Sequence, residues 1–142
     1  MSVASNAQVN PKTILVVDDD LAVLSVIKCM LENSDYMVML AHSGQAALRL
    51  AERHDLVIDL ILTDVVMPDM TGPDVAEAIL AIRPNLRVLF MSGYTDSEVV
   101  RVKVLDRALD FLPKPFTSDG LVEMVGTVLG APMQCEVAGS RR

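Results

Sequence analysis

The chain has 142 residues, which is enough for one well-buried core and too few for two ordinary domains. Hydrophobic residues make up 51% and charged residues 22%, a balance that excludes an intrinsically disordered chain. The net charge of −7 disfavours direct binding to nucleic acid or to an anionic membrane, because both interactions depend on Lys and Arg.

The two ends of the chain are polar, and we expect tails at residues 1–12 and 131–142 around one domain at 13–130. Residues 1–12 contain no apolar run typical of a signal peptide, and no stretch approaches the roughly 18 apolar residues of a membrane span. Cys29 and Cys135 belong to no CxxC pair, which predicts free thiols and no zinc site. We therefore expect a soluble cytoplasmic protein.

Short apolar runs recur along the chain at regular intervals. Because they are mostly continuous and rich in β-branched residues, they are typical of parallel strands that are covered on both faces. The predicted strands are, in order, Ile14–Val17, Tyr36–Leu40, Ile58–Leu62, Val88–Met91 and Phe111–Leu112.

The segments between these strands have helical length and recognisable starts. The first helix follows Asp20 and would place Leu21, Leu24, Ile27 and Leu31 on one face. The other helix starts are marked by a cap or a first-turn proline, at Ser43, Pro73, Thr95 with Glu98, and Thr117. Five strands alternating with five helices predict a single doubly wound α/β domain with a parallel sheet.

Polar residues follow four of the five predicted strands. They are Asp18, Asp19 and Asp20, then Asp64, then Ser92 and Gly93, and finally Lys114 and Pro115. Because the carboxyl ends of parallel strands meet at one edge of the sheet, where ligands of such folds bind, we expect these side chains to lie together.

Carboxylates held close together repel one another, so some must be protonated or neutralised by a cation. Mg²⁺ fits this site because it prefers oxygen ligands and is commonly held by one or two carboxylates and a phosphate oxygen. Asp19 and Asp64 suit that role, and Lys114 and the Ser92 hydroxyl could bind other phosphoryl oxygens. A carboxylate oxygen of Asp64 would then be the nucleophile and form an acyl phosphate.

Four motifs surround these residues: ILVVDDD at 14–20, LTDVVMPDMTG at 62–72, VLFMSG at 88–93 and FLPKPF at 111–116. Together they resemble the receiver domains of response regulators over roughly residues 13–129. The segment from 88 to 116 looks most like receivers of hybrid sensor histidine kinases. The resemblance implies a flavodoxin-like (βα)5 fold with strand order 2-1-3-4-5, the order also found in the chemotaxis member of the family.

The resemblance also implies roles for individual residues. Asp64 is the phosphoacceptor, and Mg²⁺, or Mn²⁺ in its place, is bound by Asp18, Asp19, Asp64 and the backbone carbonyl of Val66. The remaining roles are phosphoryl binding and switching by Ser92, Lys114 and Phe111, and a cis peptide bond at Pro115. Val66 and Tyr94 depart from the chemotaxis-type pattern, and we hypothesise that they shield the acyl phosphate and lengthen its lifetime, which the decay rate of the phosphorylated protein would measure.

The family mechanism implies a histidine kinase or histidine phosphotransfer domain as donor. The resemblance further implies that phosphorylation shifts the surface of the fourth helix, fifth strand and fifth helix towards a state that binds an unknown downstream protein. The protein assists its own phosphorylation and dephosphorylation but is not expected to be a multiple-turnover enzyme.

Three other functions remain alternatives. A phosphorylation-independent docking module usually lacks the acceptor, an acidic residue or the lysine, whereas this chain has all of them. A small aspartyl-phosphate hydrolase usually places its nucleophile after the first strand, whereas Asp64 follows the third. Dinucleotide binding would need a GxGxxG motif after the first strand, and none is present.

Overall fold

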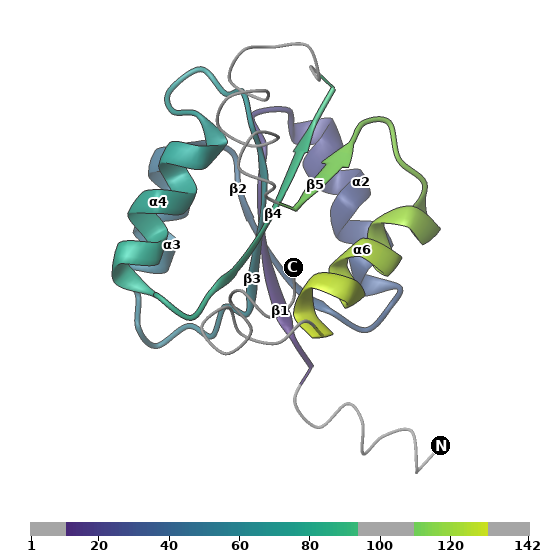
Figure 1. Ribbon diagram of the computed structural model, residues 1–142, viewed down its shortest axis with the longest axis horizontal. Helices are drawn as coiled ribbons and strands as arrows, with labels where there is room; N and C mark the ends of the chain where they lie inside the picture. Colours follow the sequence, from purple (N-terminus) through teal and green to yellow (C-terminus); the bar gives the residue numbers. More distant parts are fainter. Residues whose placement is uncertain (1–10, 94–109, 131–142) are drawn as a thin grey trace, which may run out of the picture.

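The strands form one parallel five-stranded sheet (Figure 1). The computed structural model describes residues 11–93 and 110–130. The sheet has the predicted order β2-β1-β3-β4-β5, and each neighbouring pair is parallel. The strands are β1 (Thr13–Val17), β2 (Met37–Ala41), β3 (Leu60–Asp64), β4 (Arg87–Ser92) and β5 (Phe111–Pro113).

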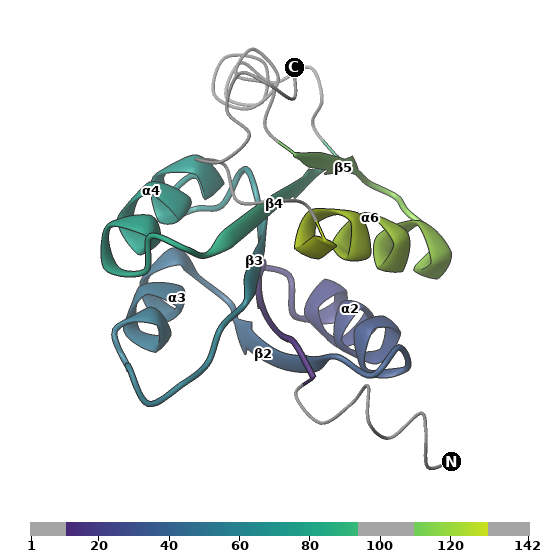
Figure 2. The same cartoon turned by 60° about the horizontal axis from the view of Figure 1, so that its bottom comes forward.

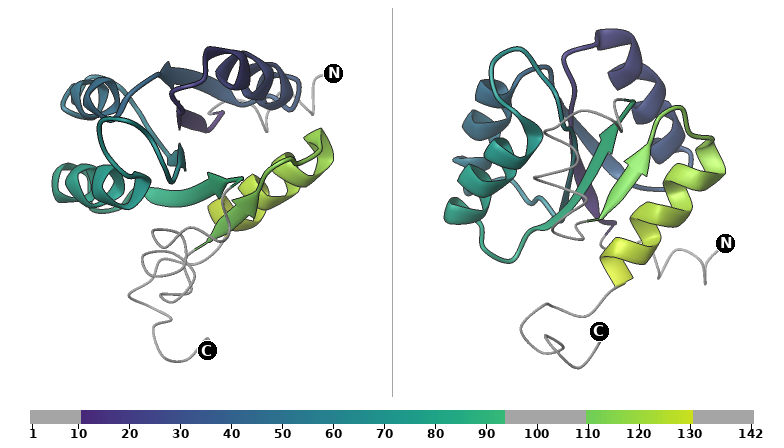
Figure 3. Two further views of the ribbon diagram at one scale, coloured as in Figure 1. Left: turned by 90° about the horizontal axis from the view of Figure 1, so that it is seen from above. Right: turned by 45° about the horizontal axis from the view of Figure 1, so that its top comes forward.

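Helices cover both faces of the sheet (Figures 2 and 3). One face packs against α2 (Leu21–Glu32) and α6 (Ser118–Gly130), and the other against α3 (Gly44–Ala51) and α4 (Gly72–Ile82). The helix predicted to begin at Thr95 lies outside the described residues. None of the described helices is both long and apolar enough to cross a bilayer.

The side chains of each central strand alternate between two apolar cores. Ile14 and Val16 of β1 contact the cluster under α2 and α6, whereas Leu15 and Val17 contact the cluster under α3 and α4. All four are fully buried. Burial of a Val, Leu or Ile side chain contributes about 1.5–3 kcal/mol, so these continuous apolar runs fix the strands at the centre of the sheet.

Short polar side chains cap the helices at the carboxyl edge of the sheet. Asp20 Oδ1 accepts from the Ala22 N–H at 2.9 Å, as predicted, and Ser43 Oγ accepts from the Ala46 N–H at 3.0 Å. Thr117 Oγ1 accepts from the backbone N–H of Gly120 at 2.9 Å. These bonds satisfy amides that have no partner within their helix and so set where each helix begins.

Two arginines bind the carboxyl ends of helices at the opposite edge of the sheet. Arg83 donates to the carbonyls of Ala51 at 2.9 Å and Arg53 at 2.6 Å, at the end of α3. Arg87, four residues later, donates to the last two carbonyls before the end of α6, at 2.8 and 2.7 Å. Guanidinium groups there satisfy orphan carbonyls and complement the negative end of each helix dipole.

The structure differs from several sequence expectations. Strand β2 spans Met37–Ala41 rather than Tyr36–Leu40, and β4 and β5 extend beyond their predicted bounds. Strand β3 begins at Leu60 rather than Ile58 and extends to Asp64. Asp59, directly before the strand, accepts the Thr13 N–H through Oδ2 at 2.7 Å. Leu21 is 65% exposed, although its predicted companions Leu24, Ile27 and Leu31 are buried. Leu21 is the first residue of α2, and this first turn begins at the carboxyl edge, beyond the cover of the strands.

Candidate functional site

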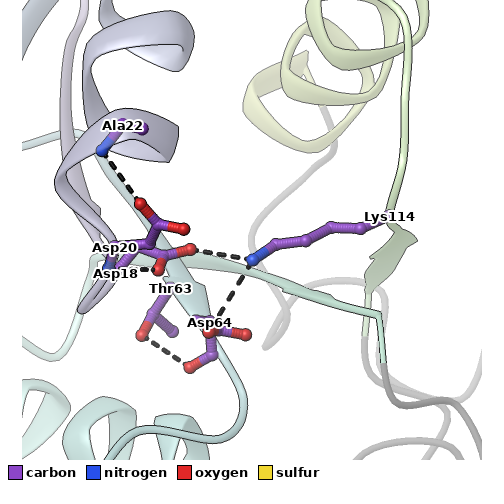
Figure 4. Close-up of polar contacts among 6 residues, drawn as sticks. All are labelled: Asp18, Asp20, Ala22, Thr63, Asp64 and Lys114. Atoms are coloured by element: carbon purple, nitrogen blue, oxygen red, sulfur yellow. Dashed lines mark hydrogen bonds and ion pairs between the residues drawn. The ribbon is translucent and has the colours of Figure 1, made fainter.

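The polar residues that follow the strands converge at the carboxyl edge, as the parallel topology predicts (Figure 4). Asp64 is the last residue of β3 and is in register with Met91 of β4. Asp18 directly follows β1, and Lys114 directly follows β5. The Lys114 side chain reaches across the sheet edge towards Asp18 and Asp64.

Lys114 binds the acidic residues through its ammonium group. Its Nζ donates to Asp18 Oδ2 at 2.8 Å and lies 3.7 Å from Asp64 Oδ2. Burial alone would lower the pKa of Lys114, but the hydrogen bond to Asp18 and the negative charges around it outweigh burial and raise the pKa. Lys114 is therefore a fixed positive charge beside Asp64 at neutral pH.

Asp18 is buried, and both of its carboxylate oxygens have protein partners. Oδ1 accepts from the backbone N–H of Asp20 at 2.9 Å, and Oδ2 accepts from Lys114. Asp18 therefore holds the Asp20 backbone and the Lys114 side chain in place, in addition to supplying a negative charge. The free carboxylate oxygens of the cluster therefore come mainly from Asp19 and Asp64.

Asp64 carries the least satisfied group of the site. Its side chain is 8% exposed, and its buried Oδ1 accepts no hydrogen bond from the described residues. Burial raises the pKa of Asp64 to about 6; the charge of Lys114 and the nearby backbone N–H of Val65 oppose this rise, and the charges of Asp18 and Asp19 add to it. A buried carboxylate oxygen without a donor is costly, so this atom is a candidate position for a ligand.

The three carboxylates fit a hard divalent cation. Asp18, Asp19 and Asp64 each offer an oxygen, and these oxygens lie within 4.8 Å of one another. Oxygens that share an octahedral Mg²⁺ at about 2.1 Å lie about 3 Å apart when adjacent and about 4.2 Å apart when opposite. A bound cation would draw these oxygens closer together and would give the unpartnered Asp64 Oδ1 a partner.

The loop between β3 and α4 is closed on itself next to Asp64. The Gly72 N–H donates to the Val65 carbonyl at 2.7 Å, and the Val65 N–H donates to the Met91 carbonyl at 3.0 Å. A Cβ at Gly72 would lie 2.3 Å from the Asp64 carbonyl oxygen, so only glycine permits this approach. Val66, whose carbonyl is a candidate metal ligand, lies within this loop and is 37% exposed.

The other predicted site residues lie around this centre. Ser92 is fully buried at the end of β4, and its carbonyl accepts from the Lys114 N–H at 2.9 Å. Phe111 is partly buried against a cluster that includes Val65 and Phe90. The Lys114–Pro115 peptide bond is cis. Tyr94 lies outside the described residues.

An acidic cluster with a lysine at the carboxyl edge of a parallel five-stranded sheet defines a receiver-type site, and comparison with known families agrees. Residues 14–126 match the model of the response regulator receiver domain. The chain belongs to this family.

Relatives of known structure include a CheY-like response regulator receiver domain protein from Methanospirillum hungatei JF-1. It is 31% identical, with a TM-score of 0.76 over 84% of this chain and 94% of that chain. The receiver domain of the hybrid histidine kinase CckA is 34% identical, with a TM-score of 0.69 over 82% of this chain and 98% of that chain. The predicted flavodoxin-like fold is confirmed.

Curated relatives are much longer proteins. The sensor kinase CckA of Brucella abortus (strain 2308) is 34% identical over 117 residues, which are 82% of this chain and 12% of that protein. The transcriptional regulatory protein ZraR of Escherichia coli (strain K12) is 38% identical over 108 residues, or 76% of this chain and 24% of that protein. The chain thus matches one part of multidomain signalling proteins and is a receiver domain of two-component signalling.

Proposed function

We propose that Asp64 accepts a phosphoryl group in a Mg²⁺-dependent reaction and that the resulting acyl phosphate is the signal. The observation that carries the proposal is the buried Asp64 Oδ1, which has no donor among the described residues although Asp18, Asp19 and Lys114 surround its carboxylate. A divalent cation and an incoming phosphoryl group would complete this incomplete arrangement of charges.

In the proposed reaction, an Asp64 carboxylate oxygen attacks the phosphorus of a phosphohistidine. An O–P bond forms as the P–N bond breaks, and the electron pair of that bond returns to the imidazole nitrogen. Mg²⁺, held by Asp18, Asp19, Asp64 and the Val66 carbonyl, would neutralise charge on the phosphoryl oxygens. Lys114 would bind one phosphoryl oxygen and so exchange part of its contact with Asp18 for the new anion.

The consequences of phosphorylation belong to the same proposal. The Ser92 hydroxyl would bind another phosphoryl oxygen, Phe111 would turn inward, and the surface of the fourth helix, fifth strand and fifth helix would shift for a downstream protein. Val66 and Tyr94 would set the lifetime of the acyl phosphate. We also propose that the domain occupies residues 13–130 and works in the cytoplasm, where ATP is available to phosphorylate its donor.

The first test is intact-protein mass spectrometry after incubation with acetyl phosphate or phosphoramidate. We expect one phosphoryl adduct per chain that requires Mg²⁺, is lost in Asp64→Asn, and is retained in Asp20→Asn. Asp20 is the matched control because it lies beside the cluster but caps α2, a task that Asn performs equally well.

The alternatives give different outcomes in this experiment. Sustained release of phosphate over many turnovers would indicate a small aspartyl-phosphate hydrolase. Absence of an adduct from either small donor, together with no effect of beryllofluoride on the protein, would favour a docking module that works without phosphorylation.

An apolar groove beside the site supports a protein as phosphodonor. It has a volume of about 320 Å³ and is lined by α2 and by the segment after β5, through residues that include Val23, Val26, Met30, Pro115 and Phe116. Val26 is 52% exposed, and Lys114 lies in the wall of the groove. A helix of a histidine kinase or phosphotransfer domain that packs its apolar side here would bring a phosphohistidine to Asp64.

Val26→Glu is expected to separate protein donors from small donors. A charge in the groove opposes docking of an apolar helix, so phosphotransfer from a phosphohistidine protein should slow about tenfold or more, the scale of a lost interface contact. The adduct from acetyl phosphate should form at the wild-type rate, because Val26 lines the groove and Asp64 belongs to the acidic cluster. The rates are measured by radiolabel transfer, and equal slowing with both donors would exclude the groove as a docking surface.

A further inference from the structure

The loop that follows the phosphoacceptor is tied to a helix from another part of the chain. Asp69, in the β3–α4 loop, accepts the Gly44 N–H through Oδ1 at 3.2 Å and the Gln45 N–H through Oδ2 at 3.1 Å. These amides belong to the first turn of α3, where backbone N–H groups have no partner within the helix. Asp69 thus joins the loop of Asp64 to the start of α3.

Close packing reinforces this link. A Cβ added at Gly44 would lie 2.8 Å from Met70 Sδ and 2.9 Å from Val75 Cγ2, so α3 begins directly against the loop and α4. The two helices lie side by side on this face of the sheet (Figure 1). Gly44 therefore lets the amides of α3 come close enough for Asp69 to bind them.

The loop is thus held at both ends and in the middle. At its ends, the Gly72 N–H binds the Val65 carbonyl at 2.7 Å. In the middle, Asp69 binds α3. Only residues 66–68 lie between the closed end and the Asp69 link, and Met67 of this stretch is buried in the core under α3 and α4. Val66 and its carbonyl are consequently positioned from both sides.

We propose that Asp69 is a positioning residue of the cation site, which fixes the β3–α4 loop through the start of α3 and thereby preorganises the Val66 carbonyl beside Asp64. This inference rests on the proposed function, because it concerns the same Mg²⁺. A ligand that is already held in its binding geometry loses less conformational freedom when the ion arrives, so the tie strengthens Mg²⁺ binding without touching the ion.

Asp69 is suited to this task because it stays charged at neutral pH. Asp69 is exposed, and the slight burial it has tends to raise its pKa, but hydrogen bonds from the amides of Gly44, Gln45, Met70 and Asp69 itself outweigh burial and lower the pKa. A carboxylate at the start of a helix also interacts favourably with the helix dipole.

The test compares two variants that each remove a cap from α3. Asp69→Ala removes the bonds to Gly44 and Gln45, whereas Ser43→Ala removes the Ser43 Oγ bond to the Ala46 N–H and leaves the loop intact. Mg²⁺ affinity is measured by calorimetric titration. We expect it to weaken about fivefold in Asp69→Ala, because groups that support metal ligands typically change affinity at or above this scale. In Ser43→Ala we expect a change of less than about twofold. Asp69→Ala should also speed amide exchange at Gly72, measured by NMR.

A third variant separates positioning from charge. Asp69→Asn keeps an oxygen that can accept one of the two amides but has no negative charge, so an affinity between those of Asp69→Ala and the wild type supports positioning. An Asp69→Asn affinity equal to that of Asp69→Ala would show that only charge matters and would overturn the inference. Equal losses in Asp69→Ala and Ser43→Ala would overturn it as well, while the proposed function would stand. Absence of Mg²⁺ binding to the wild type would refute both.

Discussion

Replacement of Gly72 by alanine is expected to lower the free energy of unfolding by about 3 kcal/mol, at the upper end of ordinary overpacking. The added Cβ would lie 2.3 Å from the Asp64 carbonyl oxygen and 3.0 Å from Val65 Cα. Both are backbone atoms at the end of a central strand, so no side-chain rotation relieves the contact. The chain must move at Asp64, which should also impair phosphorylation.

Gly126→Ala is the control for Gly72→Ala. Gly126 lies within α6, and the nearest atom to its added Cβ is the Tyr36 hydroxyl at 4.0 Å. Alanine there should stabilise the protein by up to about 1 kcal/mol, because glycine is the poorer helix former. Urea unfolding of both variants measures the contrast. A stability of Gly72→Ala within about 0.5 kcal/mol of the wild type, the usual range for harmless substitutions, would contradict the close approach described above.

Asp64→Asn is expected to stabilise the metal-free protein at pH 7.5 by about 2–3 kcal/mol, since each pKa unit corresponds to about 1.4 kcal/mol. Burial raises the pKa of Asp64 from 3.8 to about 6, so the folded state holds this proton more tightly than the unfolded state. The resulting stabilisation is complete below about pH 4, the pKa of the unfolded carboxyl, and is lost as the pH rises through about 6. At neutral pH, the buried ionised carboxylate of Asp64 therefore lowers the free energy of unfolding, whereas the neutral amide of Asn does not.

The measurement is urea unfolding of both proteins in EDTA from pH 4 to pH 8. The advantage of Asp64→Asn should grow between about pH 4 and 6.5 and then remain constant. The mutant is needed as reference because Asp69, whose pKa is lowered, contributes stability with the opposite pH dependence. Added Mg²⁺ should narrow the difference at pH 7.5 by stabilising the wild type. A difference that is constant across this pH range would contradict the raised pKa of Asp64.

Much of the fold was predictable because the apolar runs are long and the caps are local. The continuous run of β1 and the caps Asp20, Ser43 and Thr117 were predicted correctly. The start of β3 was misplaced because Ile58 is apolar and buried like a strand residue, although it lies before the strand. Its burial comes from the core under α3 and α4, which apolar pattern alone cannot separate from a strand.

Convergence of Asp18, Asp64 and Lys114 was predictable because parallel strands end at one edge. The sequence did not predict which partner each of these side chains binds. Whether Asp18 binds Lys114 or remains free depends on side-chain paths of a few ångströms, which spacing does not encode. Asp69 was missed for a related reason. Its partners Gly44 and Gln45 are 25 and 24 residues away, and only the folded loop brings them together.

Arg83, which directly follows α4, and Arg87, the first residue of β4, restrain two helices. Arg83 and Arg87 hold the ends of α3 and α6, on opposite faces of the sheet, at the edge remote from Asp64. A helix whose carboxyl end is held by side-chain hydrogen bonds is restrained most at that end. When the carboxyl edge is disturbed, we therefore expect the ends of α3 and α6 beside the site to move more than the ends that the arginines hold.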